Sequence, residues 1–230
     1  MREPSRKPYV ALEHEFEPQH GLPERLPDGE RILWQGTPLW GVLARRAFHV
    51  DKVAGYFAVL MLWRFAVLLH DGTAPMVAMR ALGGWLLIAG LGVGLLLALA
   101  WMTARSTVYT LTDRRIVMRI GIVLSVTYNL PLNRIDRADF RPIGDTGCGD
   151  IALALETGTR IAWLHLWPHA RPWRVARPQP MLRALGDART VSALLADAWS
   201  RASGVAVQPA AQETAHSDRH LTRQPAFSAR

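Results

Sequence analysis

The stretch ALGGWLLIAGLGVGLLLALAWMTA, residues 81–104, contains no charged side chain. An α-helix needs about 20 mostly apolar residues to cross a hydrocarbon core of about 30 Å, so this stretch is long enough to span a bilayer with some tilt. Trp85 and Trp101 lie near its two ends, where indole rings favour the membrane interface. The sequence therefore predicts a transmembrane helix here.

A second apolar stretch, VAGYFAVLMLWRFAVLL at residues 53–69, precedes the first and is interrupted only by Arg64. The short connection over residues 71–79 contains glycine and proline, so the two stretches are predicted to form a transmembrane hairpin. Arg64 is not central in its span, because it lies six or seven residues before the turn at His70 and Asp71. Its long side chain either reaches outward to the interface or is buried against a polar group of a partner.

Small residues recur on one face of the second span at Gly90, Gly94 and Ala98. Small side chains four residues apart let helix backbones approach closely, which is how helices associate in lipid. This face either docks on another membrane protein or a second copy of the chain, or it packs against the first span, where Ala54 and Ala58 match it. The candidate partner-contact residues are Arg64, Gly90, Gly94 and Ala98.

Basic residues flank the hairpin on the side of its two ends and are scarce in its loop. Arg45, Arg46 and Lys52 precede the first span and Arg105, Arg114, Arg115 and Arg119 follow the second, whereas the loop contains only Arg80. Positive charge stays on the cytoplasmic side of a membrane. We therefore expect a two-pass protein of the bacterial inner, intracytoplasmic membrane with both termini in the cytoplasm.

After the second span the hydrophobic periodicity changes to two. In IVLSVTYNL, residues 122–130, apolar and polar side chains alternate, which predicts a half-buried antiparallel strand. An apolar stripe over residues 187–202 predicts one amphipathic helix. Shorter alternations occur at residues 106–111, 115–120, 135–141, 151–155 and 160–167. This order of elements predicts a membrane α+β protein: a two-helix hairpin followed by a pleckstrin-homology-like β-barrel capped by one C-terminal helix.

The flanking segments differ in composition. Both tails are polar and predicted to be disordered, and the first is acidic and rich in proline. Residues 30–52 interleave aromatic side chains with arginine, so they either lie in the membrane interface or pack onto the soluble domain. The predicted division is a tail over 1–29, a juxtamembrane segment over 30–52, a hairpin over 53–104 with helices at about 53–70 and 81–103, a cytoplasmic domain over 105–203 and a tail over 204–230.

The formal net charge is +8, and residues 105–203 carry fourteen basic and eight acidic side chains. A basic domain beside a bilayer is attracted to anionic headgroups, so membrane lipid is an expected partner. Nucleic acid is not, because the chain has no helix-turn-helix or zinc pattern and no basic run with interleaved aromatics.

No constellation of nucleophile, base and charge stabiliser is apparent, so the chain is not expected to be an enzyme, and no catalytic, cofactor-binding or metal-ligating residue is predicted. The single cysteine, Cys148, excludes an internal disulfide. His49 and His70 lie at span ends. We interpret them as interfacial histidines, which are commoner than pigment ligands. His165 is expected on a strand face and His169 in a proline-rich loop.

Several segments together resemble known families. GERILWQGTP (29–38) and VYTLTDRRIVMRIGIV (108–123) are similar to bacterial pleckstrin-homology membrane proteins. ARRAFHVDKVAGYFAVLMLWR (44–64), FRPIGDTGCGDIALAL (140–155) and PMLRALGDARTVSALLADAW (180–199) resemble the photosynthetic complex assembly proteins of purple bacteria, the PuhB family. The resemblance extends over about residues 24–202.

The resemblance implies a non-catalytic assembly factor for the photosynthetic reaction centre. Its partners would be reaction-centre subunits, with core-antenna polypeptides as an open second class and a homodimer as a further option. Two other functions remain open. One is a membrane-associated pleckstrin-homology-like protein that organises or senses anionic lipid. The other is handover of pigment or lipid by the aromatic face around Trp163 and Trp167.

Overall fold

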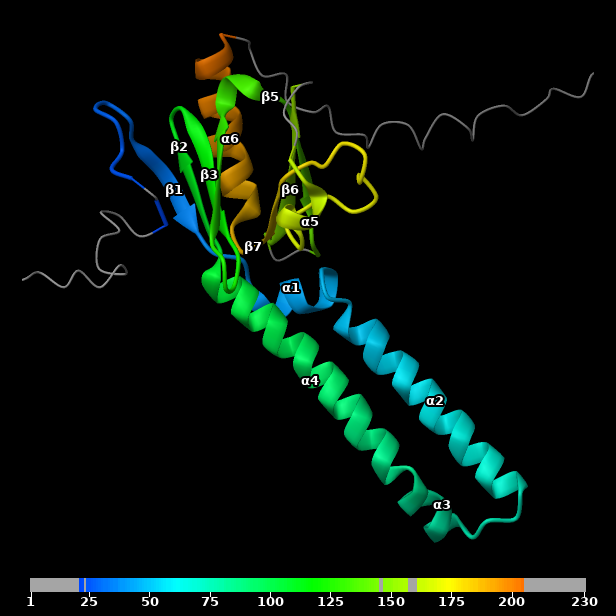
Figure 1. Cartoon of the computed structure of the whole chain (residues 1–230). Coiled ribbons are helices and arrows are strands. Elements are labelled where there is room, and N and C mark those ends of the chain that lie inside the picture. Colours follow the sequence, from blue (N-terminus) through cyan, green and yellow to red (C-terminus); the bar gives the residue numbers. More distant parts are fainter. Residues whose placement is uncertain (1–20, 23, 145–146, 157–160, 205–230) are drawn as a thin grey trace, which may run out of the picture.

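The computed structural model describes residues 21–22, 24–144, 147–156 and 161–204. A long helical hairpin projects from one end of a domain that consists of two antiparallel sheets and a helix (Figure 1). The disorder predicted for residues 1–20 and 205–230 concerns segments outside the described residues. Leu22 is buried, so the predicted disorder over residues 1–29 is wrong at this position.

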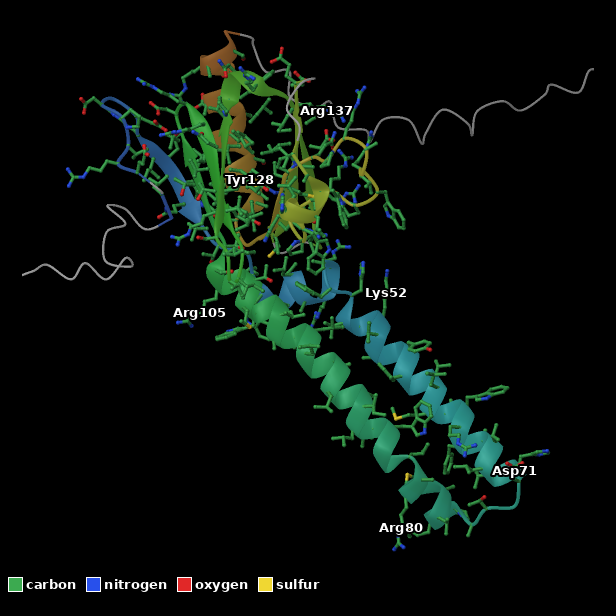
Figure 2. All side chains as sticks on the ribbon, in the orientation of Figure 1. Lys52, Asp71, Arg80, Arg105, Tyr128 and Arg137 are labelled. Carbon is green, nitrogen blue, oxygen red and sulfur yellow. The ribbon has the colours of Figure 1, made fainter. Side chains whose placement is uncertain are left out.

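The hairpin consists of α2 (Val50–His70) and α4 (Gly83–Ser106), with the short α3 (Pro75–Ala81) in the connection. Both long helices are long and apolar enough to cross a membrane. Figure 2 shows Lys52 and Arg105 at the end beside the domain, and Asp71 and Arg80 at the far end. Asp71 follows Lys52 by nineteen positions, which corresponds to about 28 Å of helix and is close to the thickness of a hydrocarbon core.

The first sheet has the order β1-β2-β3-β4 and the second the order β5-β6-β7, with antiparallel pairing throughout. A 3-10 turn over Leu132–Arg134 carries the chain from the first sheet to the second. The strands are β1 (Ile32–Gly36), β2 (Val108–Thr112), β3 (Arg115–Ile120), β4 (Val126–Pro131), β5 (Ile135–Pro142), β6 (Gly149–Leu155) and β7 (Met181–Leu185).

The predicted β-barrel is not closed, because no ladder joins the two sheets among the described residues. The helix α6 (Ala188–Ser203) stands between the sheets instead (Figure 1). Its apolar stripe, which includes Val191, Leu195 and Ala198, is buried in the core that both sheets share. The pleckstrin-homology-like domain is thus two packed sheets with one helix, and the predicted C-terminal helix is confirmed.

Two predicted strands differ from the structure. Within residues 122–130 only the part from Val126 onward is a strand. The residues from Gly121 to the start of this strand form a tight turn. Gly121 has a φ of +121°, and a Cβ there would lie 2.0 Å from the Leu124 carbonyl oxygen, so only glycine permits this turn. The expected strand at 160–167 is wrong where it is described, because Trp163–Leu166 forms the short helix α5 that buries Leu166.

Two strands were not predicted. In β7 all five side chains are buried, so the alternation that identifies a half-exposed strand is absent. The strand β1 lies inside the segment 30–52 and pairs with β2, and the helix α1 (Trp40–Arg46) follows it. This segment therefore packs onto the domain, which is the second of the two alternatives that its composition left open.

The two motifs at residues 29–38 and 108–123 contact each other. The Glu30 carboxylate is buried, where it pairs with the Arg115 guanidinium at 2.8 Å and accepts a hydrogen bond from the Thr112 hydroxyl at 2.8 Å. The Arg31 amide donates to the Asp113 carboxylate at 3.0 Å. These bonds fix β1 to the β2–β3 turn, so the motifs form one structural unit.

Candidate functional site at the hairpin and its junction with the domain

The hairpin exposes a continuous apolar surface. Leu62 and Trp63 of α2 and Leu87 and Leu91 of α4 are each more than 60% exposed. A soluble protein rarely leaves apolar side chains uncovered over such an area. This surface therefore requires lipid or another protein around it.

The small-residue face of α4 is part of that surface. Gly90, Gly94 and Ala98 are exposed, and a Cβ built at either glycine would meet no atom within 4 Å. The side of α4 that does face the rest of the chain contains Ala89 and Ala100, both buried. In this structure the glycine face therefore does not pack against the first span, which was the intrachain alternative.

Arg64 is also exposed and lies on α2 rather than α4. Among the described residues, no carboxylate lies within ion-pair distance of its guanidinium. Three of the four candidate contact residues thus share one helix face, and the fourth comes from the other helix.

The β3–β4 turn also exposes apolar side chains. The alternating pattern of residues 122–130 predicted a half-buried strand there, so this exposure was not predicted. Val123 is 91% exposed and Leu124 is 82% exposed. Val108 pairs with Arg119, so the turn that follows β3 lies beside the end of α4. The apolar tip is therefore on the same side of the domain as the hairpin.

The helix α1 fixes the hairpin to the domain. Its fully buried Leu43 belongs to a cluster with Ala100 and Ala104 of α4 and Ala184 of β7. The Leu39 amide donates a hydrogen bond of 2.8 Å to the Ala184 carbonyl. Because α1 contacts both the second span and the second sheet, the hairpin cannot swing freely against the domain.

A buried polar network lies at the same junction. The imidazole of His169 is fully buried, with Nδ1 2.6 Å from the Tyr109 hydroxyl and Nε2 3.2 Å from the Thr107 hydroxyl. The backbone amide of Arg183 donates to the Tyr109 oxygen at 3.3 Å. One arrangement satisfies these groups: Tyr109 donates to Nδ1, and the Nε2 proton is donated to Thr107.

Burial governs the ionisation of this network. Burial, together with the smaller effect of the nearby Arg183 charge, lowers the pKa of His169 to about 3. It also raises the pKa of Tyr109. Both groups are therefore neutral near pH 7, and their hydrogen bonds join β2 and the residue before it to the segment before β7.

The other residues singled out for chemistry are scattered. His49 stands alone before α2 with a φ of +53°, and His70 ends that helix at the opposite end of the hairpin. The Ile143 amide donates to the Cys148 carbonyl at 2.8 Å, which joins the end of β5 to the start of β6. Within the described residues, no group of three or more His, Cys, Asp or Glu side chains could hold a metal ion.

Comparison with known proteins gives two matches. A family model described as Bacterial PH domain matches residues 47–199. A protein of Rhodobacter capsulatus described as an uncharacterized 23.7 kDa protein in the puhA 5' region is 39% identical over 184 residues, which cover 80% of this chain and 86% of that protein. No solved structure matches.

Proposed function

The chain belongs to the bacterial PH domain family, and from this premise we propose that it is a non-catalytic, PuhB-type assembly factor for the photosynthetic reaction centre. The observation that carries this proposal is the relative in the 5' region of puhA, a reaction-centre gene, to which 80% of this chain aligns at 39% identity. Core-antenna polypeptides are the second class of partner.

The membrane placement of the proposal rests on the hairpin. Two helices long enough to cross a bilayer end in Lys52 and Arg105 beside the domain, and the far loop carries Asp71 and Arg80. With positive charge kept inside, the domain and both termini lie in the cytoplasm and the hairpin in the inner membrane. The basic flanks of α1 and α4 then meet the anionic leaflet.

The open glycine face of α4 suits a temporary partner. Helices in lipid gain little from hydrophobic burial, so close packing of small residues provides contact that remains reversible. Gly90 and Gly94 supply such a face, and nothing else in the described chain occupies it. A subunit helix, or a second copy of this chain, would pack there and leave once the complex is complete.

The test uses the full chain with an affinity tag in photosynthetically growing cells that lack the native gene. The Gly90→Leu/Gly94→Leu variant should accumulate normally, because neither side chain meets a neighbour. It should, however, capture less reaction-centre subunit and support less reaction centre, measured by near-infrared absorption of membranes.

The matched control is Gly55→Leu/Gly84→Leu, which makes the same change at two other open positions of the hairpin. Reduced reaction centre with both variants would mean that added bulk is harmful in itself. Unchanged reaction centre with a full deletion of the gene would refute the assembly function. Bound pigment in the purified protein would instead favour the handover function.

A further inference from the structure

The second sheet carries a cavity of about 610 Å³ on the face away from the core. Along β6 and β7 the side chains of Asp150, Ala152, Met181 and Arg183 line it, whereas Ile151 and Leu182 between them point into the core. The C-terminal end of α1 and the segment before β7 form its walls. The arginines that line it are Arg46, Arg141, Arg171 and Arg183.

Positive charge dominates this cavity, because two carboxylates face four guanidinium groups, and both carboxylates are already engaged. Asp139 pairs with Arg137 at 2.8 Å and with Arg171 at 2.6 Å. Asp150 accepts a hydrogen bond of 2.8 Å from the Ala184 amide. The carboxylates thus leave the arginines incompletely neutralised.

Arg183 is the lining residue whose surroundings most favour an anionic ligand. It is only 7% exposed, and its one side-chain hydrogen bond among the described residues runs from Nη1 to the Pro168 carbonyl at 2.8 Å. Its Nε has no partner there, and no carboxylate lies within 4 Å of its guanidinium. The Asp150 carboxylate acts on it only as an opposite charge beyond ion-pair distance. A buried guanidinium without a direct ion-pair partner is costly, so a ligand that supplies negative charge would stabilise it.

The cavity lies where the hairpin leaves the domain. Arg46 ends α1, four residues before α2 begins. Phe48 contacts Trp167 edge to face at 5.3 Å, which holds the segment before β7 against the start of α2. On that segment Trp173, next to the lining residue Pro172, is 97% exposed. An exposed indole among arginines suits the headgroup layer of a bilayer.

We propose that this cavity binds the phosphate of an anionic phospholipid headgroup. The inference rests on the membrane placement proposed above, and not on the assembly function. Guanidinium groups present paired donors that match phosphate oxygens, and the volume suits a small polar headgroup with part of its glycerol. The acyl chains would leave past the exposed Trp167 and Trp173 and along the apolar part of α2 that follows Lys52.

The test titrates the detergent-solubilised full chain with dioctanoyl phosphatidylglycerol by calorimetry. Dioctanoyl phosphatidylcholine and inorganic phosphate serve as the other two ligands. Phosphatidylglycerol should bind at least tenfold more tightly than either. The Arg46→Gln/Arg141→Gln variant, which removes two exposed lining arginines, should weaken that binding at least tenfold.

The control variant Arg174→Gln/Arg177→Gln removes the same charge from exposed positions outside the cavity and should change the affinity less than threefold. Thermal unfolding without ligand verifies that both variants are folded. Equal losses with the two variants would mean diffuse attraction and overturn the site. Inorganic phosphate that binds as tightly as the lipid would overturn the phospholipid as ligand. Reaction-centre yield does not enter this test, so its failure leaves the assembly function standing.

Discussion

The helix α4 and the strand β2 are consecutive in the chain, with Thr107 between them, yet they bury their side chains in different ways. All five residues of β2 are buried, whereas α4 buries only Ala89, Ala100, Thr103 and Ala104 of its 24 residues. Both segments are rich in apolar side chains. The chain itself covers β2, and something outside the described chain must cover α4. Apolar composition thus shows that a segment avoids water, but not what surrounds it.

The largest expected effect is a difference in stability between two leucine-to-alanine variants, one in β2 and one in α4. Leu111 of β2 is 2% exposed and Leu91 of α4 is 66% exposed. Leu111→Ala leaves a core cavity and should lower the free energy of unfolding by about 2–5 kcal/mol. Leu91→Ala should lower it by less than about 0.5 kcal/mol. Urea unfolding of the full chain in detergent, followed by tryptophan fluorescence, measures both. Equal costs would mean that the outer face of α4 is covered within the chain.

A smaller effect concerns the polar network behind β2. The pKa of His169 is about 3 in the folded chain, against an ordinary 6.5 in the unfolded chain. Between these values the unfolded state binds the additional proton, so stability falls as the pH decreases below 6.5. From pH 7.5 to 5.5 the loss from this group should be about 1.4 kcal/mol. His169→Gln, less stable at pH 7.5, should lack this part of the pH dependence. Identical slopes for both proteins would show that His169 does not titrate as buried.

The smallest effect on folding is expected at the β3–β4 turn, which exposes apolar side chains as the hairpin does. Val123→Ser/Leu124→Ser should leave the free energy of unfolding within about 0.5 kcal/mol of the original, because both side chains are exposed. A polarity-sensitive dye on Leu124→Cys, in a Cys148→Ser background, should report an apolar environment in lipid nanodiscs. The same dye on Asn133→Cys, at the opposite end of β4, should report water. Equal spectra at both sites would place the tip outside the bilayer.

The hairpin could be predicted because its signal lies within single segments. A run of apolar residues without charge, as at 81–104, has few structural solutions at that length. The amphipathic helix over 187–202 was predictable for the same reason, since its stripe is local. The boundaries shifted by a few residues only, because the first span begins at Val50 and the second extends to Ser106.

The second sheet and the junction could not be predicted from local pattern. The strand β7 is buried on both faces and follows Pro178 and Pro180, so its sequence reads as a loop. The alternation around Trp163 equally suits a strand, but the structure buries Leu166 by a helical turn. His169 acquires its role only through Tyr109, which is sixty residues away in the sequence.

Because a single residue connects α4 to β2, a tilt of α4 is transmitted directly to the first sheet. Thr107 is fully buried at the junction, and its hydroxyl lies 3.2 Å from His169, so this short connection has little room to bend. The helix is about 36 Å long. A partner that tilts its far end by about 6 Å therefore rotates the root of the first sheet by about 10°. A contact made at the far end of the hairpin would in this way change the orientation of the sheets, without any loop to absorb the motion.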